Sequence, residues 1–175
     1  MHEPSLTLNS ENFTEKKCTQ VAGFSCGETR WAEYLNEWIS GEGFKEALKR
    51  KSKVFLYYLG PDLVGYGSIG ETRISWPWPT GERQKVSIIP AIAVSKNFQG
   101  KPETASFGDR FSGQIMRDLL SHAQALKNDK LVLHVHCQNK RAQKFYENFG
   151  FEMAGDSSED QHLLMVLKMS ALIVV

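Results

Sequence analysis

The segment LVLHVHCQNKRAQKFYENFGF, residues 131–151, decides the fold class of this chain. Its first half alternates between two faces, with Leu131, Leu133 and Val135 on one and Val132, His134 and His136 on the other. This two-residue period is typical of a β-strand that turns one face to a core. The sequence therefore predicts a half-buried strand at the start of the segment.

The second half of the segment has the period of a helix. Apolar residues recur at three- and four-residue spacing, at Ala142, Phe145, Tyr146 and Phe149. Asn139 is suited to cap this helix, because its side-chain oxygen can accept a hydrogen bond from a backbone N–H of the first turn. Gly150 supplies the left-handed residue that ends many helices, and Phe151 begins another extended run.

Composition is that of a single globular domain without a global affinity for nucleic acid. A chain of 175 residues, 41% of them apolar, can bury about 70% of the surface that its unfolded form exposes. We expect one domain over residues 1–175, with a polar and partly flexible start over residues 1–17. Because the net charge is only +1, a site for a polyanion would have to be local.

The cysteines and the termini indicate a cytoplasmic protein. Cys18, Cys26 and Cys137 cannot all pair and show no metal-ligand spacing, so we expect reduced thiols and no metal site. The N-terminus lacks the basic start and long apolar run of a signal peptide, and no apolar run is long enough to span a bilayer. The C-terminal SALIVV fits an edge strand, a docking tail or an oligomer contact such as that of a homodimer.

The remaining periodicities predict alternating helices and strands. They indicate a strand over 19–24, helices over 24–39 and 43–51, strands over 54–59, 63–69 and 86–94, a helix with its apolar face from Phe111 to Leu126, and strands over 151–154 and 161–169. Ser106 or Asp109 is suited to cap the long helix. Pro90 cannot donate a hydrogen bond, so its strand needs an edge or a bulge there. In the connection over 71–84, Trp76 and Trp78 either touch a ligand or cover the sheet.

The 131–151 segment resembles the end of the GNAT superfamily of acyl-CoA N-acyltransferases. The family pattern is L-x-L-x-V, an Asn four residues later, an Ala three after it, an aromatic-Tyr pair and G-F. Val135, Asn139, Ala142, Tyr146 and Phe151 stand at these positions without a gap. The order of predicted elements resembles the GNAT fold over almost the whole chain. The resemblance implies an α/β (α+β) domain with one mixed, mostly antiparallel sheet flanked by helices and a splayed fourth and fifth strand pair.

The same resemblance implies acetyl-CoA as co-substrate and no metal. Its pantetheine arm would enter between the splayed strands, where the backbone groups of Ala93 and Val94 would bind it and polarise the thioester carbonyl. Asn139 would also contact the cofactor. Pro90 fits the place where the fourth strand departs from its neighbour.

The loop that holds the pyrophosphate in this family, Q/R-x-x-G-x-G/A, is altered in this chain. Gln99 and Gly100 begin like the family loop, but Pro102 stands where a second glycine is expected. The segment RFSGQI, residues 110–115, is a second partial match that ends in Ile. It adjoins the predicted helix start, where backbone N–H groups and the macrodipole favour an anion. We therefore favour this cradle, formed by Arg110, Ser112, Gly113 and Gln114, within an extended cofactor loop over residues 95–113.

Two side chains match catalytic positions of the family. Tyr146 corresponds to the tyrosine that protonates the leaving thiolate in many members, and a phenol with a pKa near 10 is a proton donor at neutral pH. The alternative is a tyrosine that only packs on the helix face. His134 stands where some members carry a glutamate base, and an imidazole could take the same proton. His136, on the same face, competes for that role.

The acceptor amine stays open. The segment FSCG, residues 24–27, followed by Trp31, resembles the opening of GNAT toxins that acetylate aminoacyl-tRNA, although Trp31 replaces a Leu. A tRNA would need a basic surface, such as the one that Lys45, Lys49, Arg50, Lys51 and Lys53 would form, but such a cluster is more often a solvated face. We expect an N-acetyltransferase that works by direct attack in a ternary complex on a small-molecule or peptide amine. A tRNA-acetylating toxin and a non-catalytic acyl-CoA-binding or interaction module are the alternatives.

Overall fold

The structure, a computed structural model, describes residues 6–75, 81–157 and 161–172. Within them, eight strands form one sheet in the order β1-β2-β3-β4-β6-β8-β7, with β5 paired to β3. The strands are β1 Asn9–Asn12, β2 Lys53–Leu59, β3 Asp62–Ile74, β4 Gln84–Ile88, β5 Ile92–Val94, β6 Lys130–His136, β7 Glu152–Ser157 and β8 His162–Lys168. In this part of the chain every strand pair is antiparallel except β4–β6. The expected mixed, mostly antiparallel sheet is confirmed.

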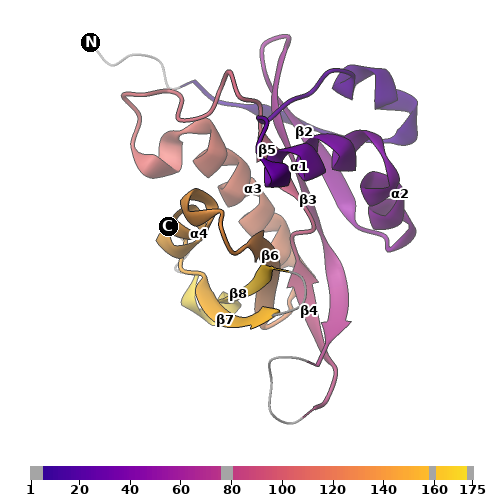
Figure 1. Cartoon of the computed structure of the whole chain (residues 1–175), viewed down its shortest axis with the longest axis vertical. Helices are drawn as coiled ribbons and strands as arrows, with labels where there is room; N and C mark the ends of the chain where they lie inside the picture. Colours follow the sequence, from indigo (N-terminus) through magenta and orange to yellow (C-terminus); the bar gives the residue numbers. More distant parts are fainter. Residues whose placement is uncertain (1–5, 76–80, 158–160, 173–175) are drawn as a thin grey trace.

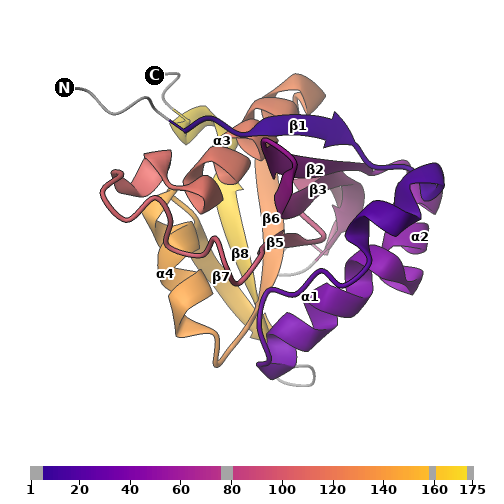
Figure 2. The same ribbon diagram turned by 90° about the horizontal axis from the view of Figure 1, so that it is seen from above.

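Helices cover both faces of the sheet (Figures 1 and 2). The helices are α1 Arg30–Ser40, α2 Glu42–Lys49, α3 Phe111–Leu126 and α4 Lys140–Asn148, with short 3₁₀ helices η1 Glu15–Val21, η2 Phe107–Asp109 and η3 Met169–Ala171. Phe55 and Tyr57 of β2 pack in the core beneath α3 and α4. Val54 and Leu56 pack in the core beneath α1 and α2. The two-residue period of the strands therefore builds one core on each face.

The predicted strand over 86–94 is two strands, because Pro90 interrupts the ladder. Up to Ile89 the chain pairs with β6, and the Ile89 N–H donates to the Val132 carbonyl at 3.0 Å. Beyond Pro90 the pairing passes to β3, where the Ser68 N–H donates to the Ala91 carbonyl at 2.9 Å. A proline has no N–H with which to continue a ladder. β5 therefore leaves β6 and pairs with β3. This is the splay that we expected for the strand predicted over 86–94.

The strand–turn–helix prediction for residues 131–151 is confirmed. The Asn139 side chain accepts a hydrogen bond from the Ala142 N–H at 3.1 Å and so caps α4. Gly150 adopts a φ of +94°, the left-handed region that glycine enters without a Cβ clash. The N–H groups of Gly150 and Phe151 close the helix on the carbonyls of Glu147 and Tyr146.

Three element predictions near the N-terminus and in the middle of the chain are corrected. The predicted strand over 19–24 is wrong, since η1 occupies Glu15–Val21. The first strand is β1, in the polar segment expected to be partly flexible. As an edge strand it bonds to the β2 backbone and needs no apolar alternation. β3 runs to Ile74, so it shortens the connection expected over 71–84. Trp76 and Trp78 lie outside the described residues.

The predicted caps of the long helix are wrong. α3 begins after Arg110, whose side chain makes no capping hydrogen bond. Ser106 instead precedes η2, and Asp109 is the last residue of η2. The Ser106 hydroxyl lies 2.5 Å from a carboxylate oxygen of Asp109. At the other end of the chain, Leu172 packs on the core, and the rest of the SALIVV tail, residues 173–175, is outside the described residues.

No helix in the described residues is long and apolar enough to cross a membrane. Cys18, Cys26 and Cys137 are all unpaired thiols. The described part of the chain contains no group of three or more His, Cys, Asp or Glu side chains that could hold a metal ion.

Candidate active site

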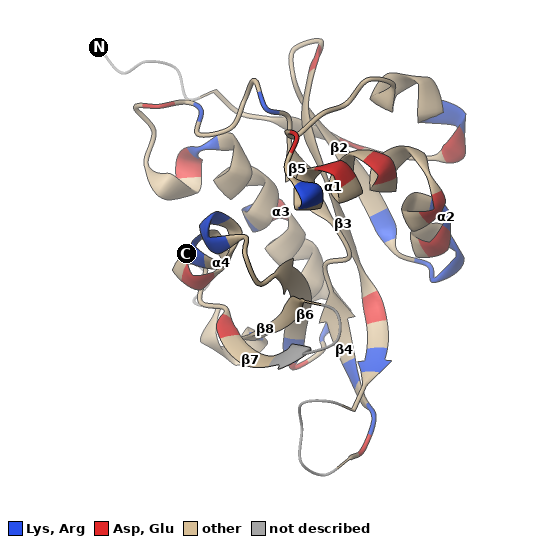
Figure 3. Cartoon of the chain, in the orientation of Figure 1, with Lys and Arg blue, Asp and Glu red and all other residues tan. Residues whose placement is uncertain are grey.

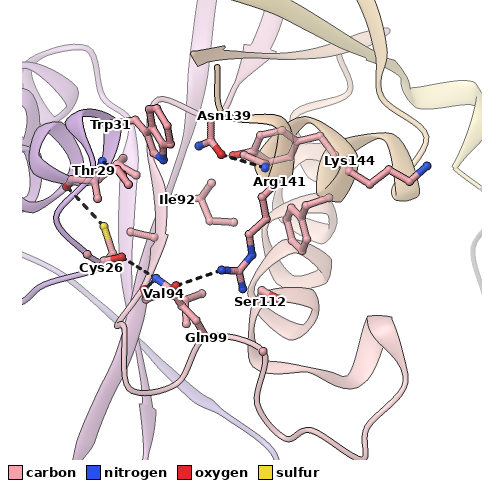
Figure 4. Close-up of a pocket in the computed structure, with 18 of the residues that line it drawn as sticks. Cys26, Thr29, Trp31, Ile92, Val94, Gln99, Ser112, Asn139, Arg141 and Lys144 are labelled. Carbon is pink, nitrogen blue, oxygen red and sulfur yellow. Dashed lines mark hydrogen bonds between the residues drawn. The ribbon is translucent and has the colours of Figure 1, made fainter. Parts of the chain in front are cut away.

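A cleft of about 620 Å³ lies beside β5, with α1 and the turn before it on one side and α4 on the other (Figure 4). Its lining combines segments that are far apart in the sequence. Thr29 and Trp31 come from the α1 side, and Asn139 and Arg141 come from the start of α4. The cleft therefore opens where the splay of β5 leaves room next to the sheet.

The backbone of β5 presents hydrogen-bonding groups to this cleft. Antiparallel strands alternate between pairs that bond each other and pairs that do not. The Ser95 N–H donates to the carbonyl of Val64, and the Ser68 N–H donates to the carbonyl of Ala91. Tyr66 and Ala93 form the opposite pair midway between these two bonded pairs, so they also bond each other through their backbones. Ala93 therefore directs its backbone groups to β3. Ile92 and Val94 direct theirs away from β3, toward the cleft.

Tyr146 lies on the cleft with its ring in the core. The residue is only 8% exposed, and its ring contacts Phe145 and Phe151. Burial raises the pKa of Tyr146 above its ordinary value, because the phenolate would lose its hydration. No group in the described part of the chain makes a hydrogen bond with its hydroxyl. The hydroxyl therefore stays protonated at neutral pH, and its hydrogen-bonding capacity is unused within the described residues.

Gln99 joins three walls of the cleft (Figure 4). Its amide nitrogen donates to the Cys26 carbonyl at 2.6 Å and to the Val94 carbonyl at 3.0 Å. Its amide oxygen accepts a long hydrogen bond, 3.5 Å, from Arg141 of α4. Gln99 therefore positions the turn before α1 against the end of β5, which the sequence pattern alone did not indicate.

The N-terminus of α3 faces the cleft over a small part of its first turn. Ser112 lines the cleft. The Phe111 N–H already donates to the Lys101 carbonyl at 2.9 Å. Gly113 is buried, and a Cβ there would lie 2.6 Å from the carbonyl oxygens of Phe107 and Gly108. The extended loop thus packs over part of the helix start that we expected to hold the pyrophosphate.

The cleft carries local positive charge in a chain that is nearly neutral. Arg110, Arg141 and Lys144 line it, and its described lining contains no Asp or Glu. The Nε atom of Arg110 is buried and has no hydrogen-bond partner among the described residues. A buried guanidinium N–H without a partner is costly unless a ligand supplies an acceptor. This charge pattern suits a polyphosphate ligand.

The two histidines proposed as bases lie outside the cleft lining. His134 is exposed on β6. His136 is buried, and its ring lies 5.4 Å from that of Trp31, which does line the cleft. The Nδ1 atom of His136 accepts a hydrogen bond from the Gln138 N–H at 3.1 Å. A neutral imidazole that accepts at Nδ1 carries its proton on Nε2.

The structure gathers most of the predicted site residues and leaves three outside. Those that line the cleft are Ala93, Val94, Gln99, Gly100, Arg110, Ser112, Asn139 and Tyr146. His134, Gly113 and Gln114 do not, and the Gln114 side chain instead bonds to the Leu8 N–H and the Leu6 carbonyl. Sequence reasoning missed Arg141 and Lys144. The feature of the sequence that could have identified them is the pair of cations on the first two turns of α4, a helix that starts next to the sheet.

Comparisons with known proteins bear on the fold and the family. The profile of the acetyltransferase (GNAT) domain family matches residues 10–172. The chain belongs to the GNAT acetyltransferase family. Among curated proteins, none matches this GNAT acetyltransferase significantly.

Solved structures share the GNAT fold at low sequence identity. The AtaT toxin, in a mutant form bound to the C-terminus of the antitoxin AtaR and acetyl-CoA, is 16% identical over 94% of each chain with a TM-score of 0.64. A Bacillus subtilis acetyltransferase in complex with CoA is 16% identical, with 93% of this chain and 99% of that chain covered and a TM-score of 0.62. A putative GNAT-family acetyltransferase from Desulfovibrio desulfuricans is 14% identical at the same coverage, with a TM-score of 0.64.

Acetyl-CoA is the acyl donor of this GNAT acetyltransferase, and the cleft residues fit it. The backbone of Ile92 and Val94 can hold an amide-rich pantetheine arm as a strand edge holds another strand. The unpartnered Nε of Arg110 suits a phosphate oxygen. The thioester supplies an activated acetyl group, and Ile92, Leu35 and Trp31 form an apolar part of the cleft lining.

Proposed function

We propose that this protein transfers the acetyl group of acetyl-CoA to a primary amine by direct attack within a ternary complex. The observation that carries the proposal is the Tyr146 hydroxyl, which lies on the cleft beside β5, protonated and without a partner in the described residues. A module that only binds acyl-CoA would not need such a group. The cleft therefore favours an enzyme over a non-catalytic binding or interaction module.

In the proposed reaction, Tyr146 is the general acid. The amine nitrogen attacks the thioester carbonyl carbon, the C–N bond forms, the C–S bond breaks, and Tyr146 gives its proton to the departing thiolate. The backbone N–H of Ile92 or Val94 is placed to stabilise the negative charge that develops on the carbonyl oxygen. Burial raises the pKa of Tyr146, so the hydroxyl is protonated at neutral pH, which is the form that a proton donor needs.

Cys26 supports direct attack rather than an acetyl-cysteine intermediate. Its thiol lines the cleft, but burial raises the pKa of Cys26 to about 11. The thiolate is the nucleophilic form of cysteine, and at neutral pH almost none of it would be present. Cys26 therefore contributes packing and a weak hydrogen bond to the Ala32 carbonyl.

The proton of the attacking amine leaves on the α1 side of the sheet. His134 remains our candidate base and would act through water, because it is exposed and lies outside the cleft lining. The hydrogen bond from Gln138 occupies Nδ1 of His136 and leaves its proton on Nε2, so His136 is poorly placed to accept another proton. We assign His136 the role of supporting Trp31.

The acceptor that we propose is a small-molecule or peptide amine. Three of the solved structures of similar fold are toxins. A tRNA substrate would need an unneutralised basic surface. Two of the five cations expected to form it are paired, Lys45 with Glu42 on α2 and Arg50, just after α2, with Glu46. Figure 3 shows acidic and basic residues mixed over α1 and α2. This charge distribution favours a neutral or small acceptor over a nucleic acid.

Replacement of Tyr146 by Phe tests the proposal, because it removes only the hydroxyl. We expect turnover to fall by about 10²- to 10⁴-fold, the usual contribution of a general acid, while the Kd for acetyl-CoA stays within about twofold. Tyr58→Phe is the matched control, since the Tyr58 hydroxyl bonds to Gln20 and neither residue lines the cleft. Steady-state kinetics and calorimetry measure both quantities. An unchanged turnover in Tyr146→Phe would remove Tyr146 from the mechanism.

A further inference from the structure

The two sides of the cleft differ in charge. Its cationic side chains lie just before α3 and on α4, and they are Arg110, Arg141 and Lys144. The residues that line it from α1 and the turn before α1 have no charged side chain, and they are Cys26, Gly27, Thr29, Trp31, Ala32 and Leu35. Burial raises the pKa of Cys26 to about 11, so this thiol is neutral as well. The phosphates of acetyl-CoA suit the cationic side, which leaves the neutral α1 side to the acceptor (Figure 4).

Trp31 gives this neutral side an aromatic surface. It is the second residue of α1, and its side chain is partly exposed. The centre of its ring lies 5.4 Å from that of His136, with 34° between the two planes, and the ring of His136 in turn contacts the ring of His162 at 5.6 Å. Because Trp31 lines the cleft and His136 does not, the imidazole supports the indole from the side away from the cleft.

Hydrogen bonds hold this neutral side in place. The Asn36 side chain accepts from the Cys26 N–H at 2.8 Å and donates to the Gly27 carbonyl at 3.0 Å, which fixes the turn before α1. The Gln138 N–H donates to Nδ1 of His136 at 3.1 Å, which fixes the orientation of the imidazole behind the indole. A surface that is already ordered binds a ligand at a smaller entropic cost. The α1 side is therefore a preformed surface for an acceptor.

We propose that Trp31 selects the acceptor, and that the acceptor is a primary amine whose carbon chain carries an aromatic ring. The inference rests on the proposed function and names the class of amine for that reaction. The ring of the acceptor packs on Trp31, and its amine extends to the thioester beside β5. Aromatic rings pair in offset or edge-to-face arrangements that stabilise a contact beyond the burial of its area.

The charge of the cleft disfavours polycationic acceptors. Its described lining contains Arg110, Arg141 and Lys144 but no Asp or Glu. A polyamine or a lysine-rich peptide would bring further positive charge into the cleft, where no carboxylate of the described lining could compensate for its lost hydration. An amine with an uncharged aromatic substituent avoids this cost.

The experiment measures kcat/KM for phenethylamine and cyclohexylethylamine in wild type and in Trp31→Leu. The two amines have the same chain and ring size, but only phenethylamine is aromatic. We expect wild type to prefer phenethylamine by about three- to tenfold, and to acetylate the polyamine spermidine at least about tenfold more slowly than phenethylamine. In Trp31→Leu, the preference for phenethylamine should fall below about 1.5-fold, through KM rather than kcat, because Trp31 contacts the ring and not the reacting atoms.

Two further variants control for indirect effects. Trp31→Phe keeps an aromatic ring at the same position, so it should retain most of the preference. Tyr34→Leu is the matched control, because it removes a ring from the same helix at a residue that is 59% exposed and lies outside the cleft lining. It should leave the preference within about 1.5-fold of the wild-type value. Thermal unfolding measures the stability of each variant.

Three results would overturn the inference. A preference that is absent in wild type, or that persists in Trp31→Leu, would remove Trp31 from acceptor selection. An equal loss in Tyr34→Leu would show only a general effect on α1. Faster acetylation of spermidine than of phenethylamine by wild type would exclude the aromatic class. Failure of the proposed function itself is distinct, since wild type would then acetylate no amine, and calorimetry on the CoA-bound protein would still compare the Kd values of phenethylamine and cyclohexylethylamine.

Discussion

Replacement of Gly65 by Ala tests whether the position of β5 makes the cleft. Gly65 lies on β3 opposite Val94, and a Cβ there would overlap the carbonyl oxygen of Ala93. It would also lie 3.0 Å from the Cδ1 atom of Ile115 and 3.3 Å from the Cα atom of Val94. Two of these three neighbours are β5 backbone, which cannot rotate away. The added methyl group must therefore push β5 from β3 and into the cleft.

The expected cost follows from overpacking. Extra methyl groups in a well-packed core cost about 1–3 kcal/mol. The change from glycine to alanine in a strand by itself stabilises the folded state by roughly 0.5–1 kcal/mol, because alanine loses less backbone entropy on folding. The free energy of unfolding should thus fall by about 1–2 kcal/mol, which lowers Tm by roughly 2–8 °C for a domain of this size. Acetyl-CoA affinity should fall as well, since the backbone groups of Ile92 and Val94 are displaced.

Gly67→Ala is the matched control on the same face of β3. Its Cβ would meet only the side chain of Leu119, with the nearest atom, Cδ1, at 2.8 Å. A side-chain end can shift more easily than a backbone, so we expect a smaller loss of stability and nearly normal acetyl-CoA binding. Thermal unfolding and calorimetry on both variants measure the contrast. If Gly65→Ala retains the wild-type Tm and Kd, or if Gly67→Ala impairs binding more, the assigned role of β5 is wrong.

Two further predictions concern protonation. Because burial raises the pKa of Cys26 to about 11, iodoacetamide should label Cys26 at pH 8 over 100-fold more slowly in the folded than in the denatured chain. The thiol of the unfolded chain loses its proton at a lower pH than the buried thiol of the folded chain. The free energy of unfolding should therefore be unaffected by this group below about pH 9 and should fall as the pH rises toward 11. Equal labelling rates would contradict the burial. His134→Ala should lower kcat/KM at neutral pH by more than His136→Ala does, because only His134 is proposed to take the proton of the amine. The reverse pattern, measured by initial rates, would transfer the role of base to His136.

The sequence predicted the elements whose signals are local. The strand before Asn139, the Asn139 cap and the Gly150 terminus follow from residues within one or two turns of each other, and all three are confirmed. Pro90 marked the place where the fourth strand breaks. The strand expected over 19–24 was wrong because an apolar run can also serve a short helix that packs on the sheet, as Val21 does in η1.

The tertiary structure decided which residues share the cleft. Gln99 contacts the Cys26 carbonyl across 73 positions of sequence and Arg141 across 42. No periodicity encodes such pairs, because they depend on the path of the loop over 95–110 and on where α1 and α4 pack. The same packing covers Gly113, ties Gln114 to the N-terminal segment and leaves His134 outside the cleft lining. The sequence by itself thus determined the GNAT framework and Tyr146, through short-range hydrogen bonds and hydrophobic period. Long-range packing determined which residues line the cleft.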